Sequence, residues 1–259
     1  MLSFQITLPQ LQMLFLVFVR IAAILVMLPV FSSRGIPSIF KVGLVLSISV
    51  ILVSTLKLDA VPVMPHILPF AIEVIGEIMI GIVIGLSVKI MFAGIQLAGQ
   101  LIGYQMGMAL ANVIDPDSSQ QLPIMAQFIE LLALLILVIT NAHHWFIRAL
   151  VESYRLVPPL GFQLNHALMA QVLEFGADMF IIAIKIGAPI ITALLLTSVA
   201  FGLIARTVPQ MNVLIVAMPL KIGVGLLFLG FSLPYITSFL RTLVNGLGKN
   251  IVLLLRAMA

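Results

Sequence analysis

The chain has 259 residues, of which 62% are hydrophobic and 8% charged, and its formal net charge is +4. Soluble domains carry about 25% charged residues. The composition therefore excludes a soluble globular protein and indicates an integral membrane protein. A helix needs roughly 20 residues to cross the ~30 Å hydrocarbon layer, so the length suffices for about six spans and leaves no room for a separate soluble domain.

The first part of the sequence predicts two membrane helices. The first span is Leu11–Phe31, with Arg20 near its middle, and the second, shorter span is Val42–Leu56. No basic residue precedes Arg20, whereas a secretory signal starts with one, so we expect the first span to be retained. The Pro-rich segment 57–66 predicts a turn.

The third span, Ile67–Ala93, is longer than one bilayer crossing. Ionisable and small residues recur along it at every fourth position: Glu73, Glu77, Gly81, Gly85 and Lys89. Residues four apart share one edge of a helix. We therefore expect this edge to face protein and not lipid.

The next stretch, Gly94–Gln127, predicts a helix, a polar loop and a second helix. Residues that permit close helix packing recur every fourth position: Gly99, Gly103, Gly107 and Ala111. Pro116 ends the first helix and Pro123 suits the first turn of the second. A simple connection between membrane helices would show the same glycine spacing. However, three glutamines make this helix too polar for lipid, which implies a packed or wet environment: Gln96, Gln100 and Gln105.

The remaining sequence predicts further spans and one interfacial segment. Ile124–Ile139 is apolar, and Asn141–Gln163 is amphipathic, as is common for a helix at a membrane surface. Three more segments follow: Phe175–Ala205, Val213–Leu240 and a final helix, Arg241–Ala259.

Eight ionisable residues fall within this apolar sequence: Arg20, Glu73, Glu77, Lys89, Glu130, Asp178, Lys185 and Lys221. A charge near the bilayer centre costs about 2.5–3.5 kcal/mol, so we expect each to find a partner in this chain or in another subunit. If the chain made six simple crossings, the basic residues in its connections would divide 6 against 3 between the two sides of the membrane. One side would carry Lys57, Arg148, Arg155, Arg241, Lys249 and Arg256, and the other Arg34, Lys41 and Arg206. This weak bias indicates either that the spans are miscounted or that the helices are not arranged as simple bilayer crossings.

Motifs of an enzyme are not found in the sequence. Glu73 and Glu77 lie one turn apart and are suited to a proton relay, but structural pairing with bases such as Lys89 or a neighbour is the favoured interpretation. His143 and His144 are adjacent and would point in different directions on a helix, which disfavours metal binding. The sequence also lacks cysteines, nucleotide-binding motifs and a basic tract. We expect no catalysis, no cofactor and no nucleic acid.

Three segments together resemble the FliR family of flagellar type III export proteins, which is related to the SctT family of injectisomes. They are FVRIAAILVMLPVFSSRGIP at Phe18–Pro37, GYQMGMALANVIDPDSSQQLP at Gly103–Pro123 and ARTVPQMNVLIVAMPLKI at Ala205–Ile222. The resemblance covers essentially the whole chain.

The resemblance implies an all-α membrane bundle of tilted helical hairpins within a hetero-oligomeric pore, located in the bacterial inner membrane at the flagellar basal body. FliP-like and FliQ-like chains would be its partners, alongside membrane lipid. Residues 1–165 would correspond to a FliP-like part and residues 166–259 to a FliQ-like hairpin. Much of such an assembly stands above the membrane plane, which would explain the weak charge bias.

The resemblance also implies a plug in the channel, formed by the loop 107–121. Its seal would consist of Met106, Gly107, Met108, Leu110, Val113, Ile114, Asp115, Pro116 and Asp117. Relatives often carry aromatic residues there, whereas this chain offers aliphatic ones. An unfolded protein substrate would displace the plug. The tip of the C-terminal hairpin would face an FlhB-like switch component at the cytoplasmic entrance. This tip would consist of Arg206, Pro209, Gln210 and Asn212.

Three alternatives remain open at this point. An ion-coupled secondary transporter would use Glu73 and Glu77 as coupling acids and would show inverted repeats, which we do not find. A structural scaffold would lack a gating loop. The same gate subunit could also serve a virulence injectisome instead of a flagellum.

Overall fold

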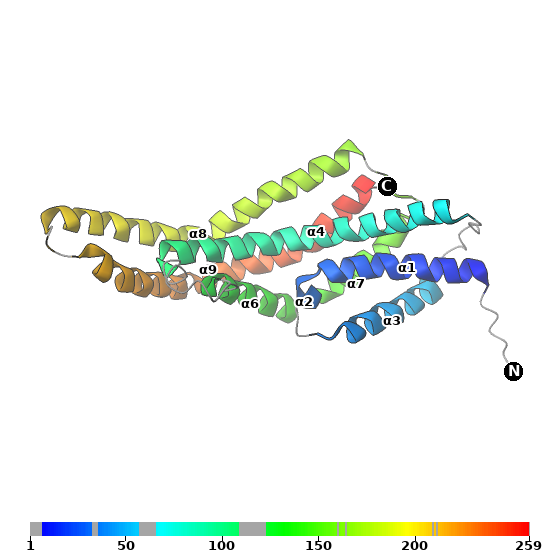
Figure 1. Cartoon of the computed structure of the whole chain (residues 1–259), viewed down its shortest axis with the longest axis horizontal. Coiled ribbons are helices and arrows are strands. Elements are labelled where there is room, and N and C mark those ends of the chain that lie inside the picture. Colours follow the sequence, from blue (N-terminus) through cyan, green and yellow to red (C-terminus); the bar gives the residue numbers. More distant parts are fainter. Residues whose placement is uncertain are drawn as a thin grey trace. The chain divides into compact units, whose positions relative to one another are not determined.

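The chain starts its regular structure with a pair of helices in the computed structural model. The first helix, α1 (Leu8–Met27), begins where the Thr7 backbone N–H donates a hydrogen bond of 3.1 Å to the Gln10 side-chain oxygen. It ends because Leu28 is extended (ψ 129°), as expected of a residue before proline. The short helix α2 (Pro29–Ser32) follows, and α3 (Ser38–Leu56) then packs beside α1 (Figure 1).

The structure describes residues 7–32, 36–56, 66–108, 123–159, 161–163, 165–208, 210 and 212–258. All its regular elements within these ranges are helices, and five of the helices are long and apolar enough to cross a membrane. The number rises to six if α6 (Ile124–Ile139) and α7 (His143–Leu156) form one broken span. The prediction of an all-α membrane bundle is confirmed.

Three helices are about twice as long as a membrane crossing requires. They are α4 (Ile67–Gln105), α8 (His166–Thr207) and α9 (Val213–Met258), with 39, 42 and 46 residues. At 1.5 Å per residue they measure about 58–69 Å, against a hydrocarbon layer of ~30 Å. Each must tilt strongly or extend beyond the hydrocarbon.

Several predicted boundaries are wrong. Helix α4 runs without a break past Ala93, and α9 runs without a break past Leu240, although both were expected to divide there. Helix α8 begins nine residues before the predicted Phe175 because Asn165 caps it: its Oδ1 accepts a hydrogen bond of 2.9 Å from the Leu168 N–H. Three polar residues, His166, Gln171 and Glu174, interrupt the apolar sequence between this cap and Phe175.

The helices pack into two compact units. Three of the boundaries between the units fall inside α4, α8 and α9, and the fourth lies between α6 and α7. Unit 1 comprises residues 1–90, 142–175 and 246–259, and unit 2 comprises residues 91–141 and 176–245. This division follows packing. The division at residue 166 into FliP-like and FliQ-like parts is based on sequence resemblance and not on packing, and it stays a prediction.

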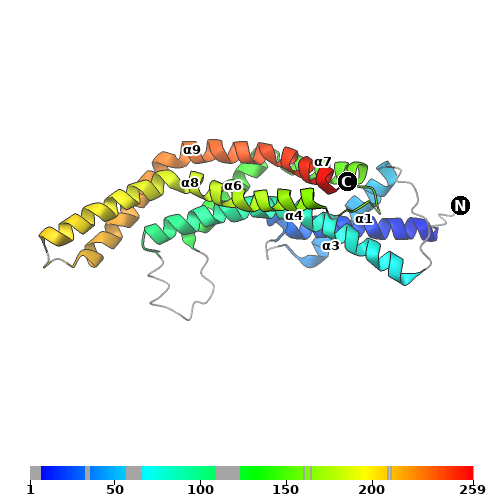
Figure 2. The same cartoon turned by 90° about the horizontal axis from the view of Figure 1, so that it is seen from above.

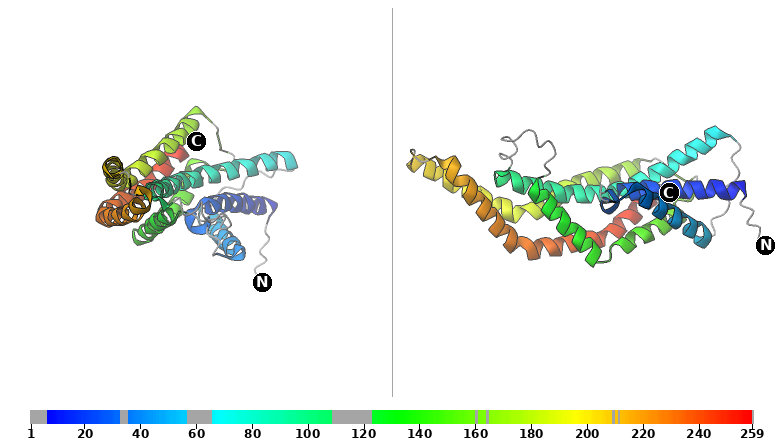
Figure 3. Two further views of the ribbon diagram at one scale, coloured as in Figure 1. Left: turned by 60° about the vertical axis from the view of Figure 1, so that its left-hand side comes forward. Right: turned by 60° about the horizontal axis from the view of Figure 1, so that its bottom comes forward.

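Within unit 1, α1 lies beside α3 (Figure 3) and also contacts the first half of α4. Helix α7 contacts the last turns of α9, where Gly248 leaves room for the ring of Trp145. Met258 accepts a backbone hydrogen bond of 3.1 Å from the Gln163 N–H. The end of the chain is thereby fixed to the segment that follows α7.

Within unit 2, segments 176–207 of α8 and 213–245 of α9 run side by side as a helical hairpin (Figure 2). The Lys185 Nζ of α8 lies 5.7 Å from the centre of the Phe239 ring of α9. The last part of α4 packs against both α6 and α8, through Gly99 and Gly94 respectively. Three sequence-distant segments therefore share one core.

Candidate functional site

A buried ion pair connects α1 to α4 in unit 1. The side chain of Arg20 is fully buried and that of Glu77 is 2% exposed. The Arg20 Nε donates to Glu77 Oε2, and Nη2 donates to Oε1 at 2.9 Å. The two planar groups thus meet in the bidentate geometry that arginine favours with a carboxylate.

The remaining guanidinium nitrogen binds the end of α7. Arg20 Nη1 donates to the carbonyl oxygens of Ser153 (3.1 Å) and Val157 (3.0 Å) and to the Ser153 hydroxyl (3.4 Å). The Ser153 carbonyl oxygen also accepts a hydrogen bond of 3.0 Å from the Val157 N–H, so Arg20 is its second donor. The carbonyls at the C-terminal end of a helix carry the negative end of its dipole, which a guanidinium stabilises.

Tyr154 completes the cluster around Arg20. Its ring centre lies 4.1 Å from the Arg20 Cζ, which is close enough for a cation–π contact. Its hydroxyl donates to the Val17 carbonyl oxygen of α1 at 3.3 Å. We call Arg20, Glu77, Ser153, Tyr154 and Val157 the Arg20 cluster. It joins three helices that are distant in the sequence.

The contacts of the Arg20 cluster indicate a structural role, which is to hold α1, α4 and α7 together. Both carboxylate oxygens of Glu77 accept from Arg20, and in the described part of the chain every buried side-chain nitrogen or oxygen has a hydrogen-bond partner. A carboxylate held in this way does not serve as a coupling acid for transport. Glu73, one turn away on α4, is half-buried and outside the cluster.

Two glycines bring α4 close to α1 beside the cluster. A Cβ added at Gly81 would lie 2.5 Å from the Ala23 Cβ and 2.9 Å from the Arg20 carbonyl oxygen. A Cβ at Gly85 would lie 2.3 Å from the Met27 Cβ. No real Cβ approaches so closely, so only glycine fits. Glu77, Gly81 and Gly85 therefore form the edge of α4 that contacts α1, whereas Lys89, further along, is exposed.

A second set of close contacts lies in unit 2, at the glycine-rich end of α4. A Cβ at Gly99 would lie 2.3 Å from the Ala126 Cα and 2.7 Å from the Met125 carbonyl oxygen, both in α6. At Gly103 the nearest atom would be the Met125 Cβ at 3.7 Å, an ordinary contact. Of these two glycines, Gly99 is therefore the one at which α6 closely approaches α4.

The end of α4 is fixed by a methionine against α9. Met106 is fully buried, and a Cβ at Gly225 would lie 2.7 Å from its side chain. Gly107 follows with φ +81°, a conformation that glycine adopts far more readily than other residues. Met108 is half-buried. The helix therefore stops at a defined place before residues 109–122.

The other predicted site residues are placed as follows. Glu130, Asp178 and Lys221 are half-buried and Lys185 is exposed. Arg206, Gln210 and Asn212 lie exposed at the end of the α8–α9 hairpin. Several residues lie outside the described part of the chain: Leu110, Ala111, Val113, Ile114, Asp115, Pro116, Asp117 and Pro209.

Helix α7 makes a contribution that the sequence did not predict. Ser153, Tyr154 and Val157 lie in the segment that was expected at a membrane surface, yet all three are buried. Backbone carbonyls carry no sequence signal. The sequence signal was indirect: Arg20 lies in an apolar span and therefore needs a partner, but its position does not indicate α7.

Comparison with known proteins identifies the family. The family described as bacterial export proteins, family 1, matches residues 11–247. The flagellar biosynthetic protein FliR of Bacillus subtilis (strain 168) is 37% identical over 221 residues, which is 83% of each chain. FliR of Pectobacterium carotovorum is 34% identical, over 86% of this chain and 84% of the relative. FliR of Escherichia coli (strain K12) is 32% identical, over 85% and 84%. The chain therefore belongs to the family of bacterial export proteins that includes the FliR proteins.

Proposed function

We propose that this chain is an inner-membrane subunit of the flagellar protein export apparatus, where it assembles with FliP-like and FliQ-like chains around a pore for unfolded proteins. The observation that carries the proposal is the family match over residues 11–247, together with FliR relatives of similar length. The role at the site is positioning and packing of helices, without catalysis.

Charged groups on the surface of apolar helices support an assembly role. Lys89 and Lys185 are exposed, and Glu130, Asp178 and Lys221 are half-buried, all in helices that are candidate spans or part of one. Against lipid, each would cost about 2.5–3.5 kcal/mol near the bilayer centre. Contact with the polar edges of neighbouring subunits, or with a water-filled lumen, removes this cost.

The long hairpin of α8 and α9 supports the same role. Its helices are about twice the thickness of the hydrocarbon layer, and many of their large apolar side chains are exposed, including Leu196, Leu203 and Phe231. We assign this hairpin to the FliQ-like part, packed against FliQ-like chains. Its tip, with exposed Arg206, would contact an FlhB-like switch component.

The gate itself is proposed to lie in the segment that begins at Gly107. The C-terminal end of α4 is held in place there, because Met106 is buried against Gly225 of α9. A hinge at Gly107 requires few helical hydrogen bonds to break. In this proposal residues 107–121 plug the lumen at rest, and an arriving unfolded chain displaces them.

Co-purification tests the assembly. Full-length chain carrying an affinity tag is expected to retain FliP-like and FliQ-like subunits in detergent, and Asp178→Asn or Lys221→Gln is expected to reduce their yield several-fold. Arg256→Gln, an exposed residue in the last turn of α9, is the matched control and should have no effect. A stable tagged chain that retains neither subunit would refute the proposal.

Deletion tests the plug. Cells carrying the chain without Ala109–Gln121 are expected to leak ions across the inner membrane while the complex still assembles. The leak is measured as loss of membrane potential with a voltage-sensitive dye. A Gly/Ser segment of equal length in place of these residues separates the effect of sequence from that of length. An assembled complex in a membrane that stays tight would contradict a plug in this segment.

A further inference from the structure

Prolines interrupt both strands of the α8–α9 hairpin at about the same level. They are Pro189 inside α8 and Pro234 inside α9. Their levels follow from the contact between Lys185 and Phe239, in which the ammonium nitrogen lies 5.7 Å from the ring centre. The two helices are antiparallel and rise equally per residue, so Pro189 lies about level with residue 235. Figure 2 shows both helices of the hairpin bending at a common level.

A proline inside a helix weakens one of its turns. Its nitrogen carries no hydrogen, so the carbonyl oxygen four residues earlier loses its helical partner, and the ring kinks the helix. The carbonyls concerned here are those of Lys185 and Gly230. Pro219, nearer the tip of α9, has no proline opposite it in α8. Because the weak turns at Pro189 and Pro234 coincide, they form one hinge across the hairpin.

The hinge divides the hairpin into a base and an arm. The base comprises residues 176–188 and 235–245, and it is packed against α4, since a Cβ added at Gly94 would lie 2.7 Å from the Met179 carbonyl oxygen. Ile236, beside the hinge, is fully buried. The base is therefore fixed within unit 2.

The arm comprises residues 190–207 and 213–233 and is about 25–30 Å long. It exposes large apolar side chains on both helices, among them Leu196, Leu203 and Ile215. Contacts of these side chains within the chain are therefore few, and in the proposed assembly neighbouring subunits would set the position of the arm.

Met106 of α4 fills a notch in the arm. Its side chain is fully buried, and a Cβ added at Gly225 would lie 2.7 Å from the Met106 Cγ and Cε and 3.0 Å from its sulfur. A Cβ at Gly107 would lie 3.9 Å from the Met218 Cγ, on the same face of α9 one heptad earlier. The last residues of α4 thus contact the arm, and a methionine side chain is flexible enough to leave and re-enter such a notch.

We propose that the arm is a lever that turns at Pro189 and Pro234, and that Met106 in the notch at Gly225 is the latch that holds it at rest. When the arm turns, Met106 leaves the notch and the segment that starts at Gly107 loses its fixed support. The inference rests on the proposed function, because it names how the plug is released. The tip of the arm, assigned to the contact with the switch component, is where the force is applied.

A disulfide across the latch tests whether it must open. The Met106 Cγ lies 2.7 Å from a Cβ at Gly225 and one carbon–carbon bond of about 1.5 Å from its own Cβ. Two cysteines there would have Cβ atoms at most about 4.2 Å apart, within disulfide range. The chain has no cysteine of its own. Inverted membrane vesicles that carry the assembled apparatus with Met106→Cys and Gly225→Cys should lose uptake of an unfolded flagellar substrate on oxidation and regain it with dithiothreitol.

Gly103→Cys with Met125→Cys is the matched control. A Cβ at Gly103 would lie 3.7 Å from the Met125 Cβ, so this disulfide joins α4 to α6 and leaves the arm free. It should form under the same conditions without loss of uptake. Normal uptake with the latch disulfide formed, loss of uptake with the control disulfide, or formation of the control disulfide alone would each overturn the latch.

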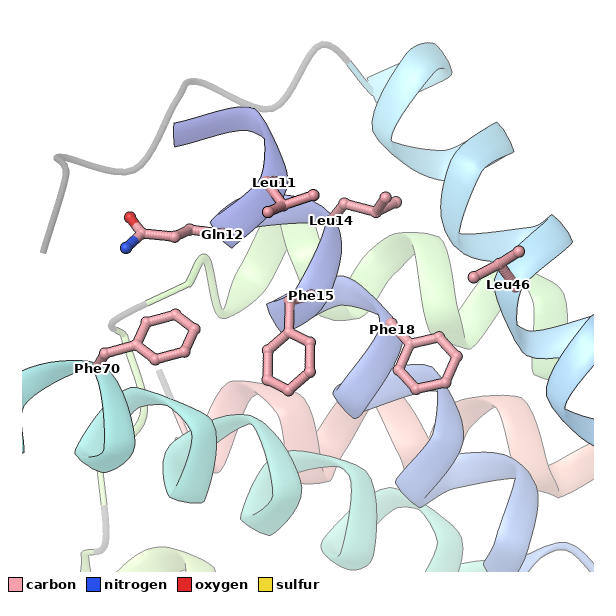
Figure 4. Close-up of a pocket in the computed structure, with 7 residues that line it drawn as sticks. All are labelled: Leu11, Gln12, Leu14, Phe15, Phe18, Leu46 and Phe70. Atoms are coloured by element: carbon pink, nitrogen blue, oxygen red, sulfur yellow. The ribbon is translucent and has the colours of Figure 1, made fainter. Parts of the chain in front are cut away.

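Gly225→Ala releases the latch without a crosslink. The added Cβ displaces the Met106 side chain, so we expect loss of membrane potential at rest. Gly223→Ala is the control on the same helix, because its Cβ would meet nothing within 4 Å, and its membrane should stay tight. Leu14→Ala controls for a general loss of packing. It widens the apolar cavity of about 510 Å³ in unit 1, where Figure 4 shows Leu14 on α1, and it should not cause a leak.

The leak also separates the latch from the proposed function. A tight membrane with Gly225→Ala, or an equal leak with either control, would overturn the latch. If deletion of 109–121 leaks and Gly225→Ala does not, the plug stands and the latch is wrong. A chain that fails to retain FliP-like and FliQ-like subunits refutes the proposed function instead.

Discussion

Replacing Glu77 with glutamine is expected to destabilise unit 1 by about 3–5 kcal/mol, because it leaves the Arg20 guanidinium buried without a counter-charge. The N–H₂ group of the new amide is a donor that would face the N–H donors of Arg20. Arginine has no hydrogen-bond acceptor, so this amide nitrogen finds no partner there. Domains are stable by only about 5–15 kcal/mol, so this loss is a large part of the total. We expect several-fold less chain in the membrane and a Tm in detergent lower by about 6 °C or more.

Glu152→Gln is the matched control for this substitution. Glu152 pairs with Arg155 at 3.3 Å, three residues along α7, and the two side chains are 40% and 65% exposed. An exposed pair of this kind contributes about 0–1 kcal/mol, so the control should retain near-normal Tm and abundance. Equal effects of the two substitutions would show that the Arg20 cluster does not hold the helices together.

A double substitution separates the charge from the packing. Arg20→Met with Glu77→Leu removes both charges and keeps much of the apolar volume, so it should recover part of the stability that Glu77→Gln loses. Full recovery is not expected, because the Ser153 and Val157 carbonyls lose the donor that Arg20 supplies. The comparison therefore measures the contribution of the contact with α7.

Helical periodicity predicted which residues share a face, and it could not predict what that face touches. Glu77, Gly81 and Gly85 were placed on one edge of a helix from their spacing alone, and in the structure this edge contacts α1. Sequence spacing predicts Lys89 or an unspecified neighbour as the partner of Glu77. It is Arg20, 57 residues away, because the close approach at Gly81 brings α1 next to Glu77.

Helix boundaries were predictable where a local signal decides them. Pro29 and Asn165 each fix a helix end through backbone geometry or a capping bond, although Asn165 was overlooked. The breaks expected near Gly94 and Arg241 do not exist. Arginine is a good helix former, and a buried glycine is tolerated where another helix packs on it, as Met179 and Ile182 do at Gly94.

Replacing Gly99 with alanine is expected to disrupt the packing of unit 2. The added Cβ would lie 2.3 Å from the Ala126 Cα, 2.7 Å from the Ala126 nitrogen and 2.7 Å from the Met125 carbonyl oxygen. All three are backbone atoms, so no rotation of a side chain relieves the overlap, and α4 and α6 must separate. Overpacking of this kind costs about 1–3 kcal/mol. We expect a lower Tm of the solubilised protein and weaker swarming on soft agar.

Gly103→Ala, one turn further along the same stripe, is the matched control. Its Cβ would make only an ordinary contact, 3.7 Å from the Met125 Cβ, and alanine favours the helix by about 0.5–1 kcal/mol. Tm should therefore be unchanged or slightly higher. A stable Gly99→Ala chain beside an unstable Gly103→Ala chain would contradict the packing described for α4 and α6.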